Sequence, residues 1–135
     1  GANEDVERLV VNNPPNKPLI NGPSKGLRNI PYTFSAQTTD PDGDNVSYFF
    51  DWGDSDFSGW SGFHPSGAEI QESYIWSTSY KYTIRVKAQD IYGADSEWTT
   101  HSFTVPRNHA THHSSVWQGF LDMFPILERL FDLYI

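Results

Sequence analysis

Apolar and polar residues alternate along most of the chain between residues 14 and 107. The clearest case is the stretch KYTIRVKAQD, residues 81–90, in which one side carries Tyr82, Ile84, Val86, Ala88 and Asp90. A strict period of two predicts an extended strand with one buried face and one solvated face. Weaker alternation predicts further strands in YTFSAQT, VSYFFDW, AEIQESYIW and WTTHSFTV.

Clusters of Gly, Pro, Asn and Asp separate these stretches, at residues 21–31, 40–45, 53–67 and 93–96. With KPLIN added, they predict six or seven strands with a turn every eight to twelve residues. That spacing is typical of an antiparallel β-sandwich, so we predict an all-β domain over 14–107. Residues 1–13 are mixed and charged and precede PPNKP, which predicts a linker or an edge strand pairing through Val10 and Val11.

The pattern changes in residues 108–135, where a polar connector is followed by VWQGFLDMFPILERLFDLYI. Apolar residues three or four apart predict an amphipathic appendage of two short helices, 115–122 and 125–133. Burying eight of its apolar side chains would contribute on the order of 10 kcal/mol before entropy, so we expect this tail to bind a surface. Docking on its own sandwich, self-association and a separate protein partner all stay open. Its candidate contacts are Trp117, Phe120, Leu127, Leu130 and Phe131.

Composition and charge exclude several function classes. The chain has a net charge of −8, which repels phosphate backbones and argues against nucleic acid as a partner. It contains no cysteine, which excludes thiol catalysis and thiolate metal sites. Because no stretch approaches about twenty apolar residues, we predict no membrane span.

Six aspartates between residues 40 and 56 allow three interpretations. A glycosidase needs two carboxyl groups across a cleft, whereas these acids fall on turns and strand ends, so we predict that the protein is not an enzyme. Asp-Pro-Asp-Gly is turn chemistry, in which Asp accepts backbone N–H bonds and Gly adopts a positive φ. Alternating Asp residues on a loop also supply the oxygens that calcium requires. The turn and calcium interpretations both stay open.

Three motifs carry a resemblance to a known family. They are DPDGD at 40–44, FDWGDS at 50–55 and YTIRVKAQDIYGADS at 82–96. In this order they resemble the PKD (polycystic kidney disease) type of immunoglobulin-like domain, whose hallmark strand ends in Trp-Asp-Phe-Gly-Asp-Gly. Here the two aromatics are exchanged and Ser55 replaces the last Gly. Ser73 and Tyr80 also stand where the family often has His and Gly.

The resemblance, over residues 14–106, implies an immunoglobulin-like sandwich of about seven strands that is extracellular and non-catalytic. We therefore expect a secreted or cell-surface spacer or binding module that mediates protein–protein contact or adhesion. The alternative is an accessory domain of a secreted hydrolase that recognises a carbohydrate or protein substrate. Some family members bind calcium between the N-terminal segment, this Asp turn and the Asp that ends the penultimate strand. The matching residues are Asn16, Asp40, Asp42 and Asp90.

Two further features have a functional and a structural interpretation. Within the aromatic stretch DFSGWSGFHPSG, Trp60 and Phe63 would bind a glycan or a protein if exposed. The alternative, which we favour, is that this insertion folds back and buries Trp60 at a sheet edge. The histidines of HATHH, residues 109–113, suit a transition metal, but a solvated connector is the commoner explanation.

Overall fold

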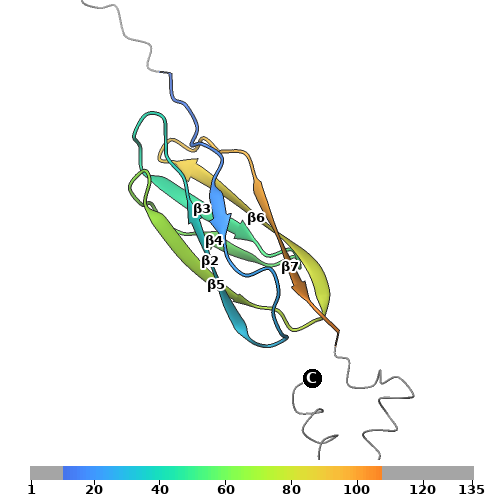
Figure 1. The fold of residues 1–135 in the computed structure, drawn as a ribbon. Coiled ribbons are helices and arrows are strands. Elements are labelled where there is room, and N and C mark those ends of the chain that lie inside the picture. Colours follow the sequence, from blue (N-terminus) through green and yellow to red (C-terminus); the bar gives the residue numbers. More distant parts are fainter. Residues whose placement is uncertain (1–10, 108–135) are drawn as a thin grey trace, which may run out of the picture. The chain divides into compact units, whose positions relative to one another are not determined.

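The computed structural model describes residues 11–107, which form seven β-strands and no helix (Figure 1). The strands are β1 (Leu19–Asn21), β2 (Pro31–Gln37), β3 (Val46–Asp51), β4 (Phe57–Trp60), β5 (Glu69–Ile75), β6 (Tyr80–Asp90) and β7 (Thr99–Val105). The predicted all-β fold is therefore confirmed. The predicted helices at 115–122 and 125–133, and the tail contacts proposed on them, lie outside the described residues.

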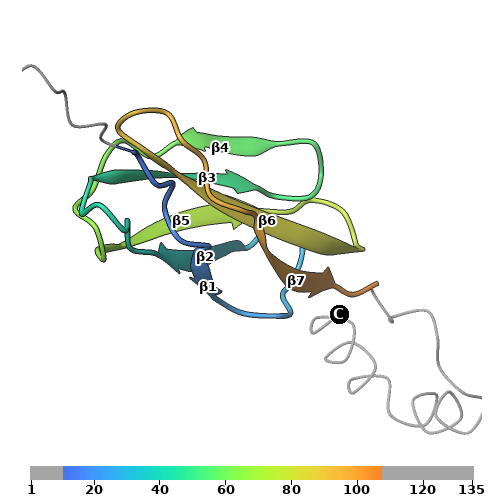
Figure 2. The ribbon, with the colours of Figure 1, turned by 90° about the horizontal axis from the view of Figure 1, so that it is seen from above.

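The strands form two antiparallel sheets, a three-stranded sheet in the order β1-β2-β5 and a four-stranded sheet in the order β4-β3-β6-β7. Figure 2 shows β3 and β4 on one side of the domain and β1 and β2 on the other. β3 pairs with β6, and the two intervening strands include β5 of the other sheet, so the chain crosses between the sheets. This is the sandwich architecture that the turn spacing predicted.

The core lies between the sheets and is built from alternate residues of each strand. On β6 the predicted inner face is buried throughout, from Tyr82 to Asp90. On β3 the predicted inner residues are likewise buried. The shared core cluster is aromatic at its centre, where Trp76 stacks on Phe103 with ring centroids 4.4 Å apart. Such pairs add to the stability that area burial alone provides.

Gly53 explains why the motif that follows β3 requires a glycine. Its φ is +85°, and a Cβ at this position would lie 2.7 Å from the carbonyl oxygen of Thr83 on β6. Only glycine combines this backbone conformation with so close an approach. The turn therefore brings the chain directly onto β6, with Trp52 buried beside it.

Of residues 1–13, predicted as a linker or an edge strand, the structure describes only the last three, and among them Val11 is 73% exposed and belongs to no strand. Within residues 11–107, no helix has the length and apolarity needed to cross a bilayer.

Candidate cation site and exposed aromatic surface

Two aspartate turns have the same backbone design. In the first, Asp40 Oδ1 accepts hydrogen bonds from the backbone N–H groups of Asp42 (2.9 Å) and Asp44 (3.3 Å), and Gly43 N–H donates to the Asp40 carbonyl. Gly43 has a φ of +77°, which suits a residue without a Cβ. Oδ1 of Asp40 thus stabilises its own turn, and Oδ2 takes no part in these hydrogen bonds.

The second turn follows β6 and repeats this arrangement. Asp90 Oδ1 accepts from the N–H groups of Tyr92 (2.9 Å) and Ala94 (3.0 Å), and Gly93 N–H donates to the Asp90 carbonyl. The two turns are adjacent because Val46, just after the first turn, pairs with Asp90 across the β3–β6 ladder. Two turns distant in sequence therefore point their acids at one place.

Asp40, Asp44 and Asp90, here called the cation cluster, each place a carboxylate oxygen within 4.8 Å of the others. Asp40 is 5% exposed and Asp90 is fully buried. The Oδ2 atoms of Asp40 and Asp44 are buried and have no hydrogen-bond partner. Buried acceptors without donors are costly, and a hard cation satisfies several such oxygens at once. These three side chains therefore offer the carboxylate oxygens that a hard cation such as calcium would need.

The pKa values of Asp44 and Asp90 are shifted in opposite directions. Burial, and then the charges of Asp40, Asp42 and Asp90, raise the pKa of Asp44. Burial also raises the pKa of Asp90, but hydrogen bonds from Asn12 Nδ2 and from the backbone of its own turn outweigh it, and the net pKa is lowered. Neutral donors thus favour the ionised form of Asp90, whereas burial and the neighbouring carboxylates disfavour the ionised form of Asp44.

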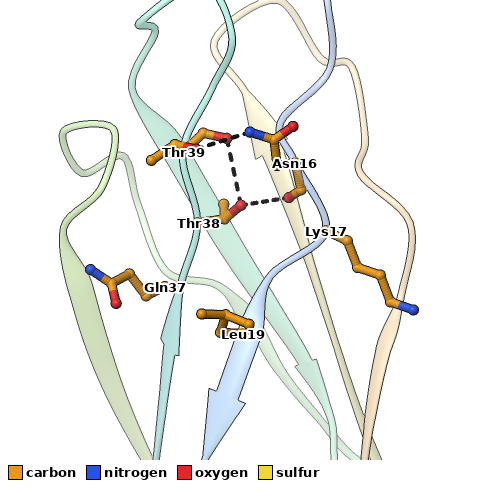
Figure 3. Close-up of a pocket in the computed structure, with 6 residues that line it drawn as sticks. All are labelled: Asn16, Lys17, Leu19, Gln37, Thr38 and Thr39. Atoms are coloured by element: carbon orange, nitrogen blue, oxygen red, sulfur yellow. Dashed lines mark hydrogen bonds between the residues drawn. The ribbon is translucent and has the colours of Figure 1, made fainter.

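The N-terminal segment, residues 11–16, is bound to the same end of the sandwich. Asn12 Nδ2 donates to Asp90 Oδ2 (2.7 Å), and the backbone N–H and Nδ2 of Asn13 donate to the two oxygens of Asp42 (2.7 and 3.1 Å). Asn16 Nδ2 donates to Thr39 Oγ1 (2.9 Å), as Figure 3 shows. The segment is therefore fastened to both acidic turns.

Of the four metal ligands expected from the resemblance, the structure brings Asp40 and Asp90 together. Asp42 and Asn16 instead hold the N-terminal segment, and Asp44 takes the third position. The alternation of Asp at 40, 42 and 44 was the available signal for Asp44. It was missed because the family pattern, rather than the turn geometry, selected the residues.

Figure 3 shows a small surface pocket where the N-terminal segment passes the end of β2. Its lining residues are Asn16, Lys17, Leu19, Gln37, Thr38 and Thr39. Thr38 Oγ1 donates to the Asn16 carbonyl (2.6 Å), and Asn16 N–H donates to the Thr39 carbonyl (2.9 Å). The polar groups of Asn16, Thr38 and Thr39 thus bond to one another and hold the N-terminal segment against β2, so we propose no ligand for this pocket.

A second acidic group, Asp51, Asp54 and Asp56, is here called the corner carboxylates. Asp51 Oδ1 accepts from Gly53 N–H (2.9 Å), and its Oδ2 accepts from Nε and Nη2 of Arg85 (3.1 and 2.6 Å). The hydroxyl of Tyr74 donates to Asp54 (2.7 Å) and lies 3.1 Å from Asp56. These acids brace the turn after β3, as the turn interpretation predicted.

The aromatic insertion does fold onto a sheet edge, where it forms β4 against β3. Trp60 nevertheless stays 42% exposed, so our preferred expectation that it would be buried is wrong. Phe57 and Phe63 are about half exposed as well, at 52% and 51%. Trp60 and Phe63, the predicted binding residues on this segment, are therefore accessible.

The outer face of the four-stranded sheet continues this aromatic surface. The Phe49 ring lies 5.6 Å from Phe57, 5.3 Å from Trp60 and 6.3 Å from Trp98. Lys87 Nζ lies 5.4 Å from the Trp60 ring and 5.1 Å from the Trp98 ring, and it pairs with Asp95. Lys87 thus contacts two of these rings while its charge is matched by Asp95.

The predicted histidine cluster at 109–113 lies outside the described residues. His101, on β7, is half-buried, and its Nε2 lies 2.9 Å from the Pro23 carbonyl oxygen. Its ring also contacts Phe34 at 5.7 Å. These contacts are those of a side chain that packs the β7 edge of the sandwich.

Comparison with known proteins supplies the remaining findings. A family model described as the PKD domain matches residues 21–103. The solved PKD domain of an M14-like peptidase from Thermoplasmatales archaeon SCGC AB-540-F20 is 39% identical, with a TM-score of 0.70, covering 72% of this chain and all of that one. The sulfur carrier protein SoxY from Chlorobium limicola f thiosulfatophilum is 15% identical, with a TM-score of 0.51 over 70% of this chain and 87% of its own, and shares the fold alone. No curated protein matches the chain.

Proposed function

The chain belongs to the PKD domain family, and on that premise we propose that it is a non-catalytic, calcium-braced module of an extracellular protein. PKD domains are generally accessory modules, often found in secreted enzymes or surface proteins. In this role the domain connects and orients neighbouring parts of a secreted enzyme. We place this role ahead of surface adhesion because a similar domain, identical at 39% of positions, comes from a peptidase.

The observation that carries the calcium brace is the pair of buried, unpartnered oxygens on Asp40 and Asp44. A divalent cation bound there would offset two of the three carboxylate charges and join the two aspartate turns. Through Asn12 and Asn13, those turns also hold the N-terminal segment. Calcium would therefore stiffen the N-terminal entry to the sandwich, which suits an orienting module.

The affinity expected for such a site is low. Extracellular calcium modules with few protein ligands bind with dissociation constants of about 0.1–1 mM. At about 10 mM calcium, mass action then predicts a gain of roughly 1–3 kcal/mol in the free energy of unfolding. Magnesium is a suitable control because it demands a tighter octahedral geometry.

The test is a calcium titration of the 135-residue chain in a chelator-treated buffer, followed by thermal unfolding and amide hydrogen exchange. We expect a rise in melting temperature with calcium but not with magnesium, together with slower exchange at the N–H groups of Asn13 and Asn16. Asp95→Asn is the matched control, because this carboxylate pairs with Lys87 outside the cation cluster. An unchanged melting temperature and unchanged exchange at 10 mM calcium, about ten times the weakest dissociation constant expected, would refute the brace.

A further inference from the structure

Residues 57–63 repeat a three-residue unit, Phe-Ser-Gly followed by Trp-Ser-Gly and a closing Phe. Each unit presents one aromatic side chain to solvent. These three residues, Phe57, Trp60 and Phe63, are here called the aromatic strip. Each has an exposed fraction between 42% and 52%. The regularity of the repeat suggests that the structure holds the rings in a defined array.

The two serines hold the repeat against β3. Ser58 Oγ accepts a hydrogen bond from Phe50 N–H, and Ser61 Oγ accepts one from Tyr48 N–H, both at 2.9 Å. Each serine hydroxyl also donates to the carbonyl of the glycine that follows it, at 2.6 and 2.9 Å. The side-chain hydroxyls thus replace ladder bonds that a regular strand would make through its backbone.

The two glycines complete the repeat by adopting a left-handed backbone conformation, with φ of +75° at Gly59 and +82° at Gly62. From one serine contact to the next, the strip advances three residues while β3 advances only two, from Phe50 to Tyr48. Each unit is therefore a bulge that inserts one extra residue. In a regular strand, neighbours three apart would point to opposite faces.

Because of the bulges, the three rings share one face. Phe57 pairs with Asp51 and Trp60 with Phe49, both on the outer face of β3. His64 pairs with the inward Val46, which places Phe63 on the outer side again. The rings therefore follow one another at intervals of two β3 residues, which is about 6.6–6.8 Å.

An exposed row of aromatic side chains such as this strip leaves apolar surface in contact with water. Contiguous exposed aromatic surface is uncommon in soluble domains and marks interaction sites. β4 is the outer strand of its sheet within the described residues, and the three side chains of the strip stay exposed there. Short, bulged edge strands are poor templates for backbone pairing, so the face of the strip and not its edge is the binding surface.

We propose that the aromatic strip binds an extended polypeptide segment that carries apolar side chains at every second position and no net negative charge. The three residues follow β3 at intervals of two residues, which matches the two-residue repeat of an extended chain, so successive rings would meet alternate side chains of the ligand. The charge follows from the protein, whose net charge is −8. The nearby cations Arg85 and Lys87 are already paired with Asp51 and Asp95 and leave no site for an anion.

This inference is independent of the calcium brace, because the strip and the cation cluster share no residue. We expect the same peptide affinity in calcium and in chelator. Conversely, variants of the strip are expected to keep the calcium-induced rise in melting temperature. A failure of one proposal therefore leaves the other standing.

The test is selection from a random dodecapeptide library on the 135-residue chain, with counter-selection on Trp60→Ala, followed by titration of the enriched peptides. Soluble cello- and chito-oligosaccharides are titrated in parallel as neutral glycan probes. We expect enriched peptides with apolar residues at i, i+2 and i+4, and at least a tenfold loss of affinity in Trp60→Ala and in Phe63→Ala. Tyr80→Ala, which removes an aromatic ring that is 65% exposed at the start of β6, is expected to bind within twofold of the parent.

Circular dichroism and an unchanged melting temperature confirm that each variant folds. If Trp60→Ala does not fold, Phe63→Ala takes its place in the counter-selection and in the titrations. Three outcomes would overturn the proposal. They are no peptide enriched over Trp60→Ala, enriched peptides without the period of two, and strip-dependent binding of oligosaccharides alone.

Discussion

The cation cluster and the corner carboxylates are two groups of three aspartates that look alike in sequence and differ in their partners. Every oxygen of Asp51 is engaged, by Gly53 N–H or by Arg85, and Tyr74 serves Asp54 and Asp56. In the cation cluster, Asp40 and Asp44 each keep a buried oxygen without a donor. The corner carboxylates are satisfied within the protein, whereas the cation cluster leaves two buried oxygens for the proposed cation.

The difference lies in residues that come from other strands. Arg85 reaches Asp51 from β6, and Tyr74 reaches Asp54 from β5. The cation cluster receives a third acid, Asp90 at the end of β6, and no basic side chain belongs to it. The role of an aspartate turn in this fold is thus decided by the side chain that faces it across the sheet, and the following variants test that rule.

The largest effect is expected from Asp90→Ala. The variant removes a fully buried carboxylate and leaves Asn12 Nδ2 and the N–H groups of Tyr92 and Ala94 without their acceptor. We expect a loss of about 2–4 kcal/mol in the free energy of unfolding, measured by urea denaturation without calcium. Asp90→Asn, which keeps one acceptor oxygen, is the control and should lose less. A loss below about 1 kcal/mol for Asp90→Ala would show that the turn does not depend on its aspartate.

Asp51→Asn is expected to cost less, about 1–2 kcal/mol, because the Arg85 side chain is 44% exposed and water compensates part of the lost pair. The amide keeps an acceptor for Gly53 N–H, so the turn itself should persist. The discriminating measurement is the same denaturation with and without calcium. The loss should be equal in both, and a loss that calcium changes would place Asp51 in the cation site.

The sequence was sufficient for the elements whose information is local. Period-two alternation identified the buried face of β6, including the buried Asp90, and turn chemistry located both aspartate turns. It was insufficient where a partner depends on register, since nothing near Asp51 indicates that Arg85 lies opposite. The exposure of Trp60 was missed for a related reason. The bulges that Ser58 and Ser61 create turn it outward, against the parity that a regular strand would impose.

Tyr74→Phe is expected to destabilise the corner carboxylates less than Asp51→Asn does. The variant keeps the ring that stacks on Trp52 at 4.8 Å and removes only the hydroxyl. We expect a loss of about 0.5–1 kcal/mol near neutral pH. Burial, and then the hydrogen bonds to Asp54 and Asp56, raise the pKa of Tyr74 above its ordinary value of 10.0. A raised pKa means that the stabilisation is complete below pH 10 and is lost as the pH rises through the folded-state pKa. The difference between parent and variant should therefore shrink in strongly alkaline urea titrations, and a constant difference would contradict this account.

Asp44→Asn is expected to have the smallest effect without calcium, and its sign should be opposite to that of the others. Because burial and three neighbouring acids raise the pKa of Asp44, its ionisation costs stability as the pH rises above 3.8, and this cost is complete above the folded-state pKa. The amide removes that repulsion, so the calcium-free variant should be as stable as the parent at pH 7 or slightly more stable. As the pH falls towards the ordinary value of 3.8, the parent should recover and the two should converge.

With calcium the order reverses, because the variant lacks a carboxylate ligand and loses most of the rise in melting temperature. Thermal unfolding of both proteins at pH 7, with chelator and with calcium, measures this reversal directly. Asp56→Asn, a substitution among the corner carboxylates, serves as the matched control and should leave the calcium response intact. A calcium response that survives Asp44→Asn and disappears with Asp56→Asn would invert the assignment, and with it the rule that the facing side chain decides the role of an aspartate turn.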